Sequence, residues 1–423
     1  MDDRKDYREI VCCALDIGEA MLVCGGEVSR VEDTVSRVLH SYGATRVDVF
    51  TIISCITLSA TFPDNTVETQ FRRVNIKAYA TDLERLEQLN ALSREICHTK
   101  PPISELRAHL AATEHTSSEQ RHSDLFRCFG YMIAGSAFAI FFGGSPMDGV
   151  AAMLISLLTW ALDLLLKKMN LQRLFHSFLV SFLAGVASLL IALTGVNIHA
   201  GQIMMGVIML MIPGIAITNS MRDLLIGDTI SGSLRLVESL LIACSVALGF
   251  AAAIFLSRGI LPNNGLDTLA PLPYVQILSA ALGSFGFSLV FRIRRKRLLL
   301  CTLGGGLTWT VYLICSAFVA NSFLCCAAAA AFGACYAEIM ARVSKAPVTS
   351  FIMATEIALI PGGTLFITMN ELVSGNGESA LLYASKTINF ALAISLGIVL
   401  IAAFAGAFCH KPLVGATGDG KRS

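Results

Sequence analysis

The chain has 423 residues, of which 54% are hydrophobic and only 15% charged, and its formal net charge is +1. Soluble domains carry about 25% charged residues, so this composition predicts a membrane protein. The net charge of +1 says nothing about a nucleic-acid partner, and we expect none. Acidic residues interrupt any apolar core in residues 1–25, so this segment is not expected to be a signal peptide.

Residues 1–125 are predicted to form a small α+β domain and its linker on the cytoplasmic side of the membrane. Hydrophobic periodicity and turn residues predict three helices at 7–24, 29–41 and 82–97, strands at 46–62 and 66–76, and a short helix from Ser104. Pro63-Asp64-Asn65 supplies the turn between the two strands. The polar run 114–123 is expected to link this domain to the membrane.

After residue 125 the sequence contains ten apolar stretches of about 18 residues or more, each long enough to cross a bilayer. They are continuously apolar instead of alternating, which predicts helices and not barrel strands. The predicted spans are 126–144, 147–166, 175–194, 203–221, 235–257, 273–291, 298–318, 322–341, 350–370 and 379–408. We therefore expect a polytopic α-helical membrane protein that contacts the lipid bilayer.

The membrane part repeats itself at an offset of 148 residues. Ile212-Pro213-Gly214 matches Ile360-Pro361-Gly362, and the only two tryptophans, Trp160 and Trp309, match one residue out of step. Each copy holds five predicted spans, an odd number, so the second copy must enter the membrane from the opposite side. The sequence thus predicts a 5+5 inverted repeat with its binding site where the copies meet. The alternative is chance similarity between apolar helices.

Lysine and arginine gather in the loops on one side of the predicted bundle, which places that side in the cytoplasm. These residues are Lys167, Lys168, Arg173, Arg222, Arg235, Arg292, Arg294, Arg295, Lys296, Arg297, Arg342 and Lys345. The opposite loops contain only Arg258. We expect an inner-membrane protein with both termini in the cytoplasm. Its predicted segments are a first repeat at 126–257, a loop at 258–272, a second repeat at 273–408 and a cytoplasmic tail at 409–423.

Pro213 and Pro361 each fall near the middle of a predicted span. Proline lacks an N–H and clashes with the preceding turn, and the glycines that follow, Gly214 and Gly362, loosen the chain further. The half-helix after each break begins with unsatisfied, partly positive N–H groups. We expect two such ends near the midplane to hold a substrate carboxylate. The alternative is an ordinary proline kink satisfied by neighbouring helices.

Polar residues follow both breaks and are further candidates for substrate binding. They are Thr218, Asn219, Thr364 and Thr368. Any one of them could instead bond to the backbone of its own helix. We include them because hydroxyl and amide groups next to a helix break can bind the carboxylate or amino group of a small molecule.

Three ionisable residues lie inside the predicted spans. Glu356 precedes the second break by five residues, and burying it as an anion is costly, so we expect it to be paired, protonated or facing a cavity. It is our first candidate for proton coupling and for binding the substrate. Glu238 and Lys386 occupy equivalent positions in the two copies and are further candidates for proton coupling. For Lys386 the alternative is snorkelling to the nearer membrane surface.

The most distinctive run of the soluble region is GGEVSRVEDT, residues 25–34. Glycine, serine and acidic residues at the start of a helix favour capping, and we expect ion pairing among the charged side chains. The candidate functional residues of this run are Gly26, Glu27, Arg30, Glu32 and Asp33. The sequence contains no nucleophile motif, no phosphate-binding loop and no metal-ligand spacing among its thirteen cysteines. We therefore predict no metal, no cofactor and no enzymatic activity.

The run 25–34, the strand through 51–53 and the run 71–74 resemble the N-terminal part of the threonine/serine exporter family. The segment 346–363, from Ala-Pro through Glu356 to Pro-Gly-Gly, resembles that family's smaller C-terminal membrane module. In some bacteria the two parts are separate, paired proteins linked to succinate export. This chain is similar to a fused pair, and the resemblance extends from about residue 7 to residue 405.

The resemblance implies efflux of threonine and serine across the cytoplasmic membrane, driven by the proton motive force. In the family, the cytoplasmic domain has been likened to hydrolases. One alternative is a C4-dicarboxylate such as succinate, but a dianion should require fixed cations, and the spans offer Lys386 and little else. Another is a membrane-anchored enzyme or sensor, for which ten spans are more than an anchor needs. The sequence also allows a homo-oligomer.

Overall fold

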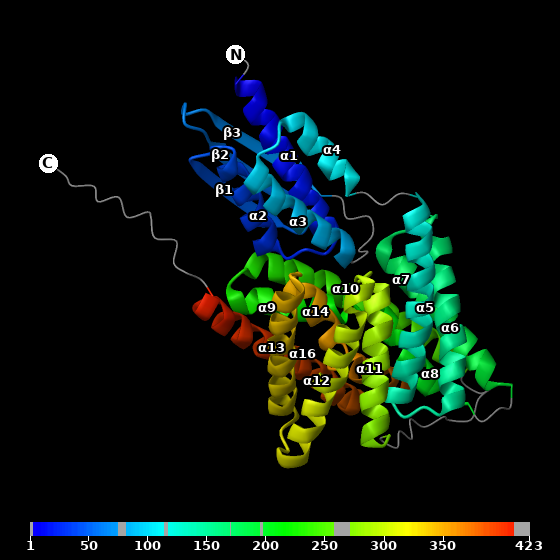
Figure 1. Ribbon diagram of the computed structural model, residues 1–423. Coiled ribbons are helices and arrows are strands. Elements are labelled where there is room, and N and C mark those ends of the chain that lie inside the picture. The colour runs from blue at the N-terminus through cyan, green and yellow to red at the C-terminus, as the bar shows by residue number, and fades with distance from the viewer. Residues whose placement is uncertain are drawn as a thin grey trace.

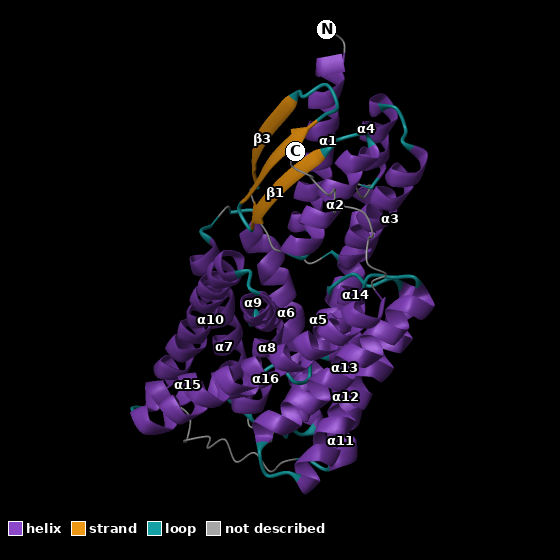
Figure 2. Ribbon diagram, turned by 90° about the vertical axis from the view of Figure 1, so that its left-hand side faces the viewer, coloured by secondary structure: helices purple, strands orange, loops and turns teal. Residues whose placement is uncertain are grey.

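The computed structural model describes residues 3–74, 82–113, 117–169, 171–194, 198–257 and 271–409. Within them, a small α+β domain is stacked on one end of a larger helical bundle (Figure 1). The same arrangement is seen from the side in Figure 2, where the three strands belong to the upper domain and the lower part is helical.

The N-terminal domain packs four helices on one face of a three-stranded antiparallel sheet (Figure 2). Its elements are α1 (Asp3–Val23), α2 (Val28–Ser41), β1 (Arg46–Ile52), β2 (Cys55–Thr61), β3 (Val67–Arg73), α3 (Leu83–Thr99) and α4 (Ile103–Ala112). Alternation along the central strand buries Ile56, Leu58 and Ala60. These side chains join one apolar core with the inner faces of the helices.

The prediction of a single strand over 46–62 is wrong. The segment is a hairpin that turns at Ile53 and Ser54, and Ile52 pairs with Cys55. The usual signal of a tight hairpin is glycine, asparagine or aspartate at the turn, and this turn has none. The predicted linker at 114–123 is also partly wrong, because α5 already begins at Ser117.

The bundle contains α5 to α16 and one short 3-10 helix. The helices are α5 (Ser117–Phe141), α6 (Pro146–Lys167), α7 (Arg173–Ala192), α8 (Ala200–Met211), α9 (Gly214–Ile226), α10 (Thr229–Ser257), α11 (Pro273–Val290), η1 (Arg295–Arg297), α12 (Leu298–Phe318), α13 (Ser322–Ser344), α14 (Val348–Thr355), α15 (Gly362–Ser374) and α16 (Gly377–Cys409). The length and apolar composition of most of these helices make this a polytopic helical membrane protein.

Eight of the described helices are long and apolar enough to cross a membrane, and the bent pair α8–α9 makes a ninth if it is counted as one span. These two helices meet at an angle of 53°. The predicted span at 350–370 is divided between α14 and α15 and is not one continuous helix. The predicted inter-repeat loop at 258–272 lies almost wholly outside the described residues, as do most of the predicted tail and the last two residues of the predicted second strand, 75 and 76.

Corresponding helices make corresponding contacts in the two parts of the bundle. Helix α7 packs on α10 as α13 packs on α16, and α9 packs on α10 as α15 packs on α16. Helices α5 and α11 pack on each other across the two parts, with Gly130 against Gly286 and Gly283 against the ring of Phe138. The later residue of α5, Phe138, contacts the earlier residue of α11, Gly283, so the two helices are antiparallel.

Ion pairs fix the N-terminal domain to the bundle. Acidic side chains of the domain face arginines of the bundle in the pairs Glu27–Arg222 at 2.5 Å, Asp82–Arg292 at 2.8 Å, Glu87–Arg297 at 3.0 Å and Glu87–Arg294 at 3.1 Å. The backbone contributes as well, because the N–H of Leu83 donates to the carbonyl of Phe291 at 3.1 Å. The bundle arginines that form these pairs therefore lie on the same side of the bundle as the N-terminal domain.

Candidate functional site

A new helix begins directly after each of the two expected prolines, and the two prolines have nearly the same backbone geometry. Helix α8 ends at Met211, close to its proline, whereas α14 already ends at Thr355, so the second break begins at Glu356. Pro213 precedes α9 with φ −76° and ψ 49°, and Pro361 precedes α15 with φ −78° and ψ 48°. Neither residue provides a side-chain cap, so the first N–H groups of α9 and α15 are not satisfied by a capping side chain. Each break therefore presents a partly positive helix end inside the bundle.

The two breaks contact each other. A Cβ atom on Gly214 would collide with the side chain of Ile360, and a Cβ atom on Gly362 would collide with the sulfur of Met209. Each glycine thus packs against the segment that precedes the other proline. This reciprocal packing brings the starts of α9 and α15 together at the centre of the bundle.

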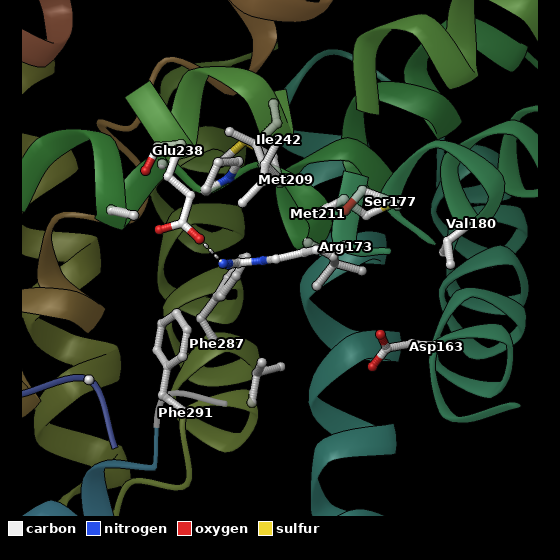
Figure 3. A pocket seen from close by; sticks show the side chains of 18 of the residues that line it. Asp163, Arg173, Ser177, Val180, Met209, Met211, Glu238, Ile242, Phe287 and Phe291 are labelled. Carbon is white, nitrogen blue, oxygen red and sulfur yellow. Dashed lines mark hydrogen bonds and ion pairs between the residues drawn. The ribbon is translucent and has the colours of Figure 1, made fainter. Parts of the chain in front are cut away.

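A cavity of about 630 Å³ lies between the N-terminal domain and the bundle. Leu22, Gly26 and Ile53 line it from the domain, and Pro213 and Asn219 line it from the first break. Figure 3 shows part of its wall, with side chains from several helices pointing into one space. The cavity therefore connects the domain interface with the start of α9.

Four of the described side chains that line this cavity are lysine or arginine, and each of the four has an acidic partner. The pairs are Arg173 with Glu238, Lys167 with Asp163 at 2.6 Å, Arg235 with Asp223 at 3.4 Å and Arg127 with Asp124 at 3.7 Å. Arg173 and Glu238 reach toward each other across the cavity (Figure 3). The charge of the lining is therefore mixed.

Sequence reasoning missed the role of Arg173, which it assigned only to a basic loop. Arg173 is the first residue of α7 and Glu238 lies in α10, 65 residues later. Only the packing of α7 on α10 brings the two side chains together. The chain carries no local pattern that indicates this pair, so it could not be found without the fold.

The predicted substrate-binding residues are divided between the cavity and the surrounding helices. Pro213, Gly214, Asn219 and the coupling candidate Glu238 line the cavity, whereas Pro361 and Gly362 do not. The remaining predicted residues of α9 and α15 lie outside the cavity lining, namely Thr218, Thr364 and Thr368. The structure therefore brings both breaks to the cavity surface, the first through Pro213 and Gly214 and the second through Ile357 and Ile360.

The threonines outside the cavity face helix α16 or their own helix. The carbonyl of Thr218 accepts a hydrogen bond from the Ser395 hydroxyl at 3.1 Å. The hydroxyls of Thr364 and Thr387 are 2.8 Å apart, and Thr368 donates to the carbonyl of Thr364 at 2.8 Å. These contacts hold α9 and α15 against α16. A role for them in binding substrate stays a prediction.

Lys386 is exposed on α16 and does not line the cavity. Its ammonium lies 4.8 Å from the centre of the Tyr383 ring, in a cation–π contact. Tyrosine and lysine on the same outward face are common near a membrane surface, which fits the snorkelling alternative.

Glu356 is buried at the end of α14, with only 3% of its surface exposed. Among the described residues, neither of its carboxyl oxygens has a hydrogen-bond partner. A Cβ atom on Gly333 of α13 would touch both this carboxyl and the hydroxyl of Thr308, so the three residues are neighbours. The adjacent residue Ile357 lines the cavity, but Glu356 does not. The equivalent position in the first repeat is Ile208, so only the second break carries a carboxyl group.

Glu27 joins the N-terminal domain to the first broken helix. Its carboxylate lies 2.5 Å from the guanidinium of Arg222 on α9, and both side chains are almost buried. Burial alone would raise the pKa of Glu27, but the positive charges of Arg222 and Arg30 outweigh it and hold the pKa below its usual value. The expected ion pair within the 25–34 run is thus made instead with the membrane bundle.

The other residues of this run have different roles. Glu32 accepts a hydrogen bond from the Thr51 N–H at 2.7 Å, and burial raises the pKa of this glutamate above its usual value. Asp33 forms an exposed ion pair with Arg37 at 2.8 Å. Gly26 approaches the carbonyl of Met21 so closely that a Cβ atom would lie 2.8 Å away. The run therefore shapes the cavity wall and the docking surface of the domain.

Within the described ranges, no group of three or more histidine, cysteine, aspartate or glutamate side chains could hold a metal ion. The cysteines that the structure describes are free thiols. The expectation of no cofactor and no metal site stays a prediction for the chain as a whole.

Two family models match this chain. One, described as "Putative threonine/serine exporter", matches residues 13–257, and the other, described as "Threonine/Serine exporter, ThrE", matches residues 276–404. A protein named "Probable threonine/serine exporter" from Mycobacterium tuberculosis is 25% identical, over 97% of this chain and 79% of its own length. A "Threonine/serine exporter" from Corynebacterium glutamicum is 23% identical, over 61% of this chain and 53% of its own length. No solved structure matches. The chain therefore belongs to the threonine/serine exporter family.

Proposed function

We propose that this protein exports small hydroxylated amino acids, such as threonine and serine, through the cavity that ends at the Pro213 break. The observation that carries the proposal is the cavity of about 630 Å³ with paired charges along its lining. A zwitterion offers one positive and one negative group, which matches a surface of mixed charge. The names of the two relatives point to the same class of substrate.

The proposed architecture is a 5+5 inverted repeat with ten membrane spans. The pairs α8–α9 and α14–α15 each count as one broken span in this scheme. Its support is the matching geometry of Pro213 and Pro361 and the matching helix contacts in the two parts. Transport would proceed as one repeat rocks against the other about the reciprocal contact of the two breaks.

The basic loops support the proposed orientation in the cytoplasmic membrane, with the N-terminal domain and both termini in the cytoplasm. In this orientation the cavity faces the cytoplasm, because the N-terminal domain forms one of its walls. An amino acid would reach Asn219 and the start of α9 from the cytoplasmic side. The structure would then represent the inward-facing state of the cycle.

Glu356 is the proposed carrier of the coupling proton. As an anion it would leave an uncompensated charge among Gly333, Thr308 and apolar neighbours, which costs several kcal/mol, whereas the protonated form is neutral. Release of the proton therefore requires that the carboxyl group reach water. Because Glu356 lies at the start of the second break, movement of this break would expose it. Proton transfer and transport are thus linked by one movement.

A dicarboxylate fits this cavity less well than a zwitterion. Asp163 and Glu238 both line it, and each cationic side chain of the lining already has an acidic partner. A dianion would meet repulsion from these carboxylates and, among the described residues of the lining, would find no uncompensated cluster of cations. Neither relative is named as a dicarboxylate transporter.

The function is tested by amino-acid efflux from cells loaded with a threonine-containing dipeptide. Cells with the protein should release threonine several-fold faster than cells without it, and an uncoupler should abolish the difference. Glu356→Gln should abolish it as well, whereas Glu378→Gln, at an exposed position at the start of α16, should have no effect. If the protein leaves threonine efflux unchanged and accelerates succinate efflux, the amino-acid assignment is wrong.

A further inference from the structure

We propose that Arg173 and Glu238 form the recognition site for the two charged groups of the transported amino acid. Arg173 would receive the carboxylate and Glu238 the ammonium. This inference rests on the proposed export of amino acids and adds a pair of residues that determines substrate class. It also gives a chemical reason for the position of the cavity.

The pair differs from the other ion pairs of the cavity lining. Lys167 and Arg127 each pair with an acid on the same helix, three or four residues away. Arg235 pairs with a carboxylate in a nearly buried contact, in which the two side chains are only 13% and 11% exposed. Arg173 and Glu238 instead come from two helices, and their side chains are 37% and 40% exposed. Of these four pairs, the one formed by Arg173 and Glu238 is both interhelical and open to the cavity.

An exposed pair of this kind can exchange its partner. Solvent screens the attraction between Arg173 and Glu238, so separating them costs little. The planar guanidinium presents two parallel N–H donors that match a carboxylate, and a carboxylate accepts hydrogen bonds from an ammonium group. An α-amino acid inserted between the two side chains would replace one ion pair with two. The exchange leaves no charge uncompensated, which is the condition for binding a zwitterion in a partly enclosed site.

The surroundings of the pair suit a small side chain. Met209, Ile242 and Phe287 lie around the two charged groups and give this part of the cavity apolar walls (Figure 3). Ser177 and Asn219 line the same cavity and supply hydrogen-bonding groups for a hydroxyl. This combination of one interhelical ion pair, apolar walls and two neutral polar groups is what threonine or serine requires.

The test is binding to the purified full-length protein in detergent, measured by calorimetry with three ligands. L-Threonine carries both charged groups, threoninol lacks the carboxylate, and 3-hydroxybutyrate lacks the ammonium. The intact protein should bind L-threonine at least tenfold more tightly than either analogue. Arg173→Gln should weaken L-threonine at least tenfold and leave threoninol unchanged, and Glu238→Gln should weaken L-threonine and leave 3-hydroxybutyrate unchanged. Arg342→Gln, which removes an exposed ion pair with Glu338 outside the cavity lining, should preserve the discrimination.

A purely structural link between α7 and α10 gives a different pattern. In that case Arg173→Gln and Glu238→Gln would weaken all three ligands by the same factor, or none of them, and the inference would be overturned. The double variant Arg173→Glu with Glu238→Arg keeps an ion pair between the helices. Recognition predicts that this variant folds with an unchanged Tm and loses L-threonine affinity, whereas a structural link predicts normal affinity.

The proposed function can fail separately from this inference. If the intact protein exports threonine from loaded cells and the single variants bind all three ligands as the intact protein does, the recognition pair is wrong and the exporter assignment remains. If the intact protein neither exports nor binds threonine, both are wrong.

Discussion

The side chain of Ile360 occupies the space that a Cβ atom on Gly214 would need. In the same way, the side chain of Met209 occupies the space that a Cβ atom on Gly362, at the second break, would need. Each broken helix is therefore held by the segment that leads into the other break. A shift of one break must therefore move the other. Such coupled movement would allow the two sides of the transport pathway to open alternately.

Gly214→Ala and Gly362→Ala should each block transport by wedging the two breaks apart. Overpacking of this kind costs about 1–3 kcal/mol, so the variants should still fold. We expect threonine efflux from dipeptide-loaded cells to fall at least tenfold. Gly377→Ala is the control, because nothing lies within 4 Å of a Cβ atom there. Normal efflux by both break variants would show that the close contact is not needed for the cycle.

Thr308→Val should reduce proton-driven efflux without lowering the free energy of unfolding. The Thr308 hydroxyl is buried without a hydrogen-bond partner in the described residues, and it neighbours Glu356 across Gly333. Removing an unsatisfied hydroxyl should leave the free energy of unfolding unchanged or raise it by about 1 kcal/mol. If the hydroxyl relays the proton, proton-driven efflux should nevertheless fall several-fold. Thr310→Val, whose hydroxyl bonds to its own helix, should not affect efflux.

The docking of the N-terminal domain should depend on pH through Glu27. Its folded-state pKa lies below the usual value, so its ionised form stabilises docking above the unfolded-state pKa. This contribution is lost as the pH falls through the folded-state pKa. Proteolysis of the α1–α2 region should therefore accelerate on acidification below about pH 4.5.

Glu27→Gln provides the matching variant for this pH dependence. It should lower the stability of the docked state by about 3 kcal/mol, because Arg222 is left nearly buried without its partner. It should also remove the part of the acid response that Glu27 causes. Unaltered proteolysis profiles from pH 7 down to about pH 3 in both proteins would exclude this ion pair as a docking contact.

Two neighbouring arginines should differ in their effect on domain docking. Arg297 pairs with Glu87 in a nearly buried contact, whereas Arg295 lies over the ring of Phe126 and is exposed. Arg297→Met should increase hydrogen exchange in α3 at least tenfold, and Arg295→Met should change it little. Equal effects of the two variants would mean that the loop charge as a whole, and not this contact, holds the domain.

The helix breaks could be predicted because their cause is local. Proline and glycine act on the backbone wherever they stand, and their repetition at Pro213 and Pro361 indicated a shared geometry. The direction in which individual side chains point after each break could not be predicted in the same way. After a break the rotation of the next helix is set by its packing, and this turned Asn219 into the cavity and Thr364 toward α16.

Long-range pairs were beyond the reach of sequence reasoning. The contact of Arg173 with Glu238 joins residues far apart in the chain, and neither residue belongs to a recognisable motif. The turn of the first hairpin was missed for a different reason, because Ile53 and Ser54 carry no turn signal. The buried position of Glu356, by contrast, followed from its place inside an apolar span.

The most direct test of proton-coupled export through this site uses proteoliposomes loaded with labelled threonine. An inward proton gradient should accelerate threonine release by the intact protein several-fold. With Glu356→Gln, release should no longer respond to the gradient, while exchange of internal for external threonine continues. If Glu356→Gln responds to the gradient as the intact protein does, Glu356 does not carry the coupling proton and the mechanism proposed for it is contradicted.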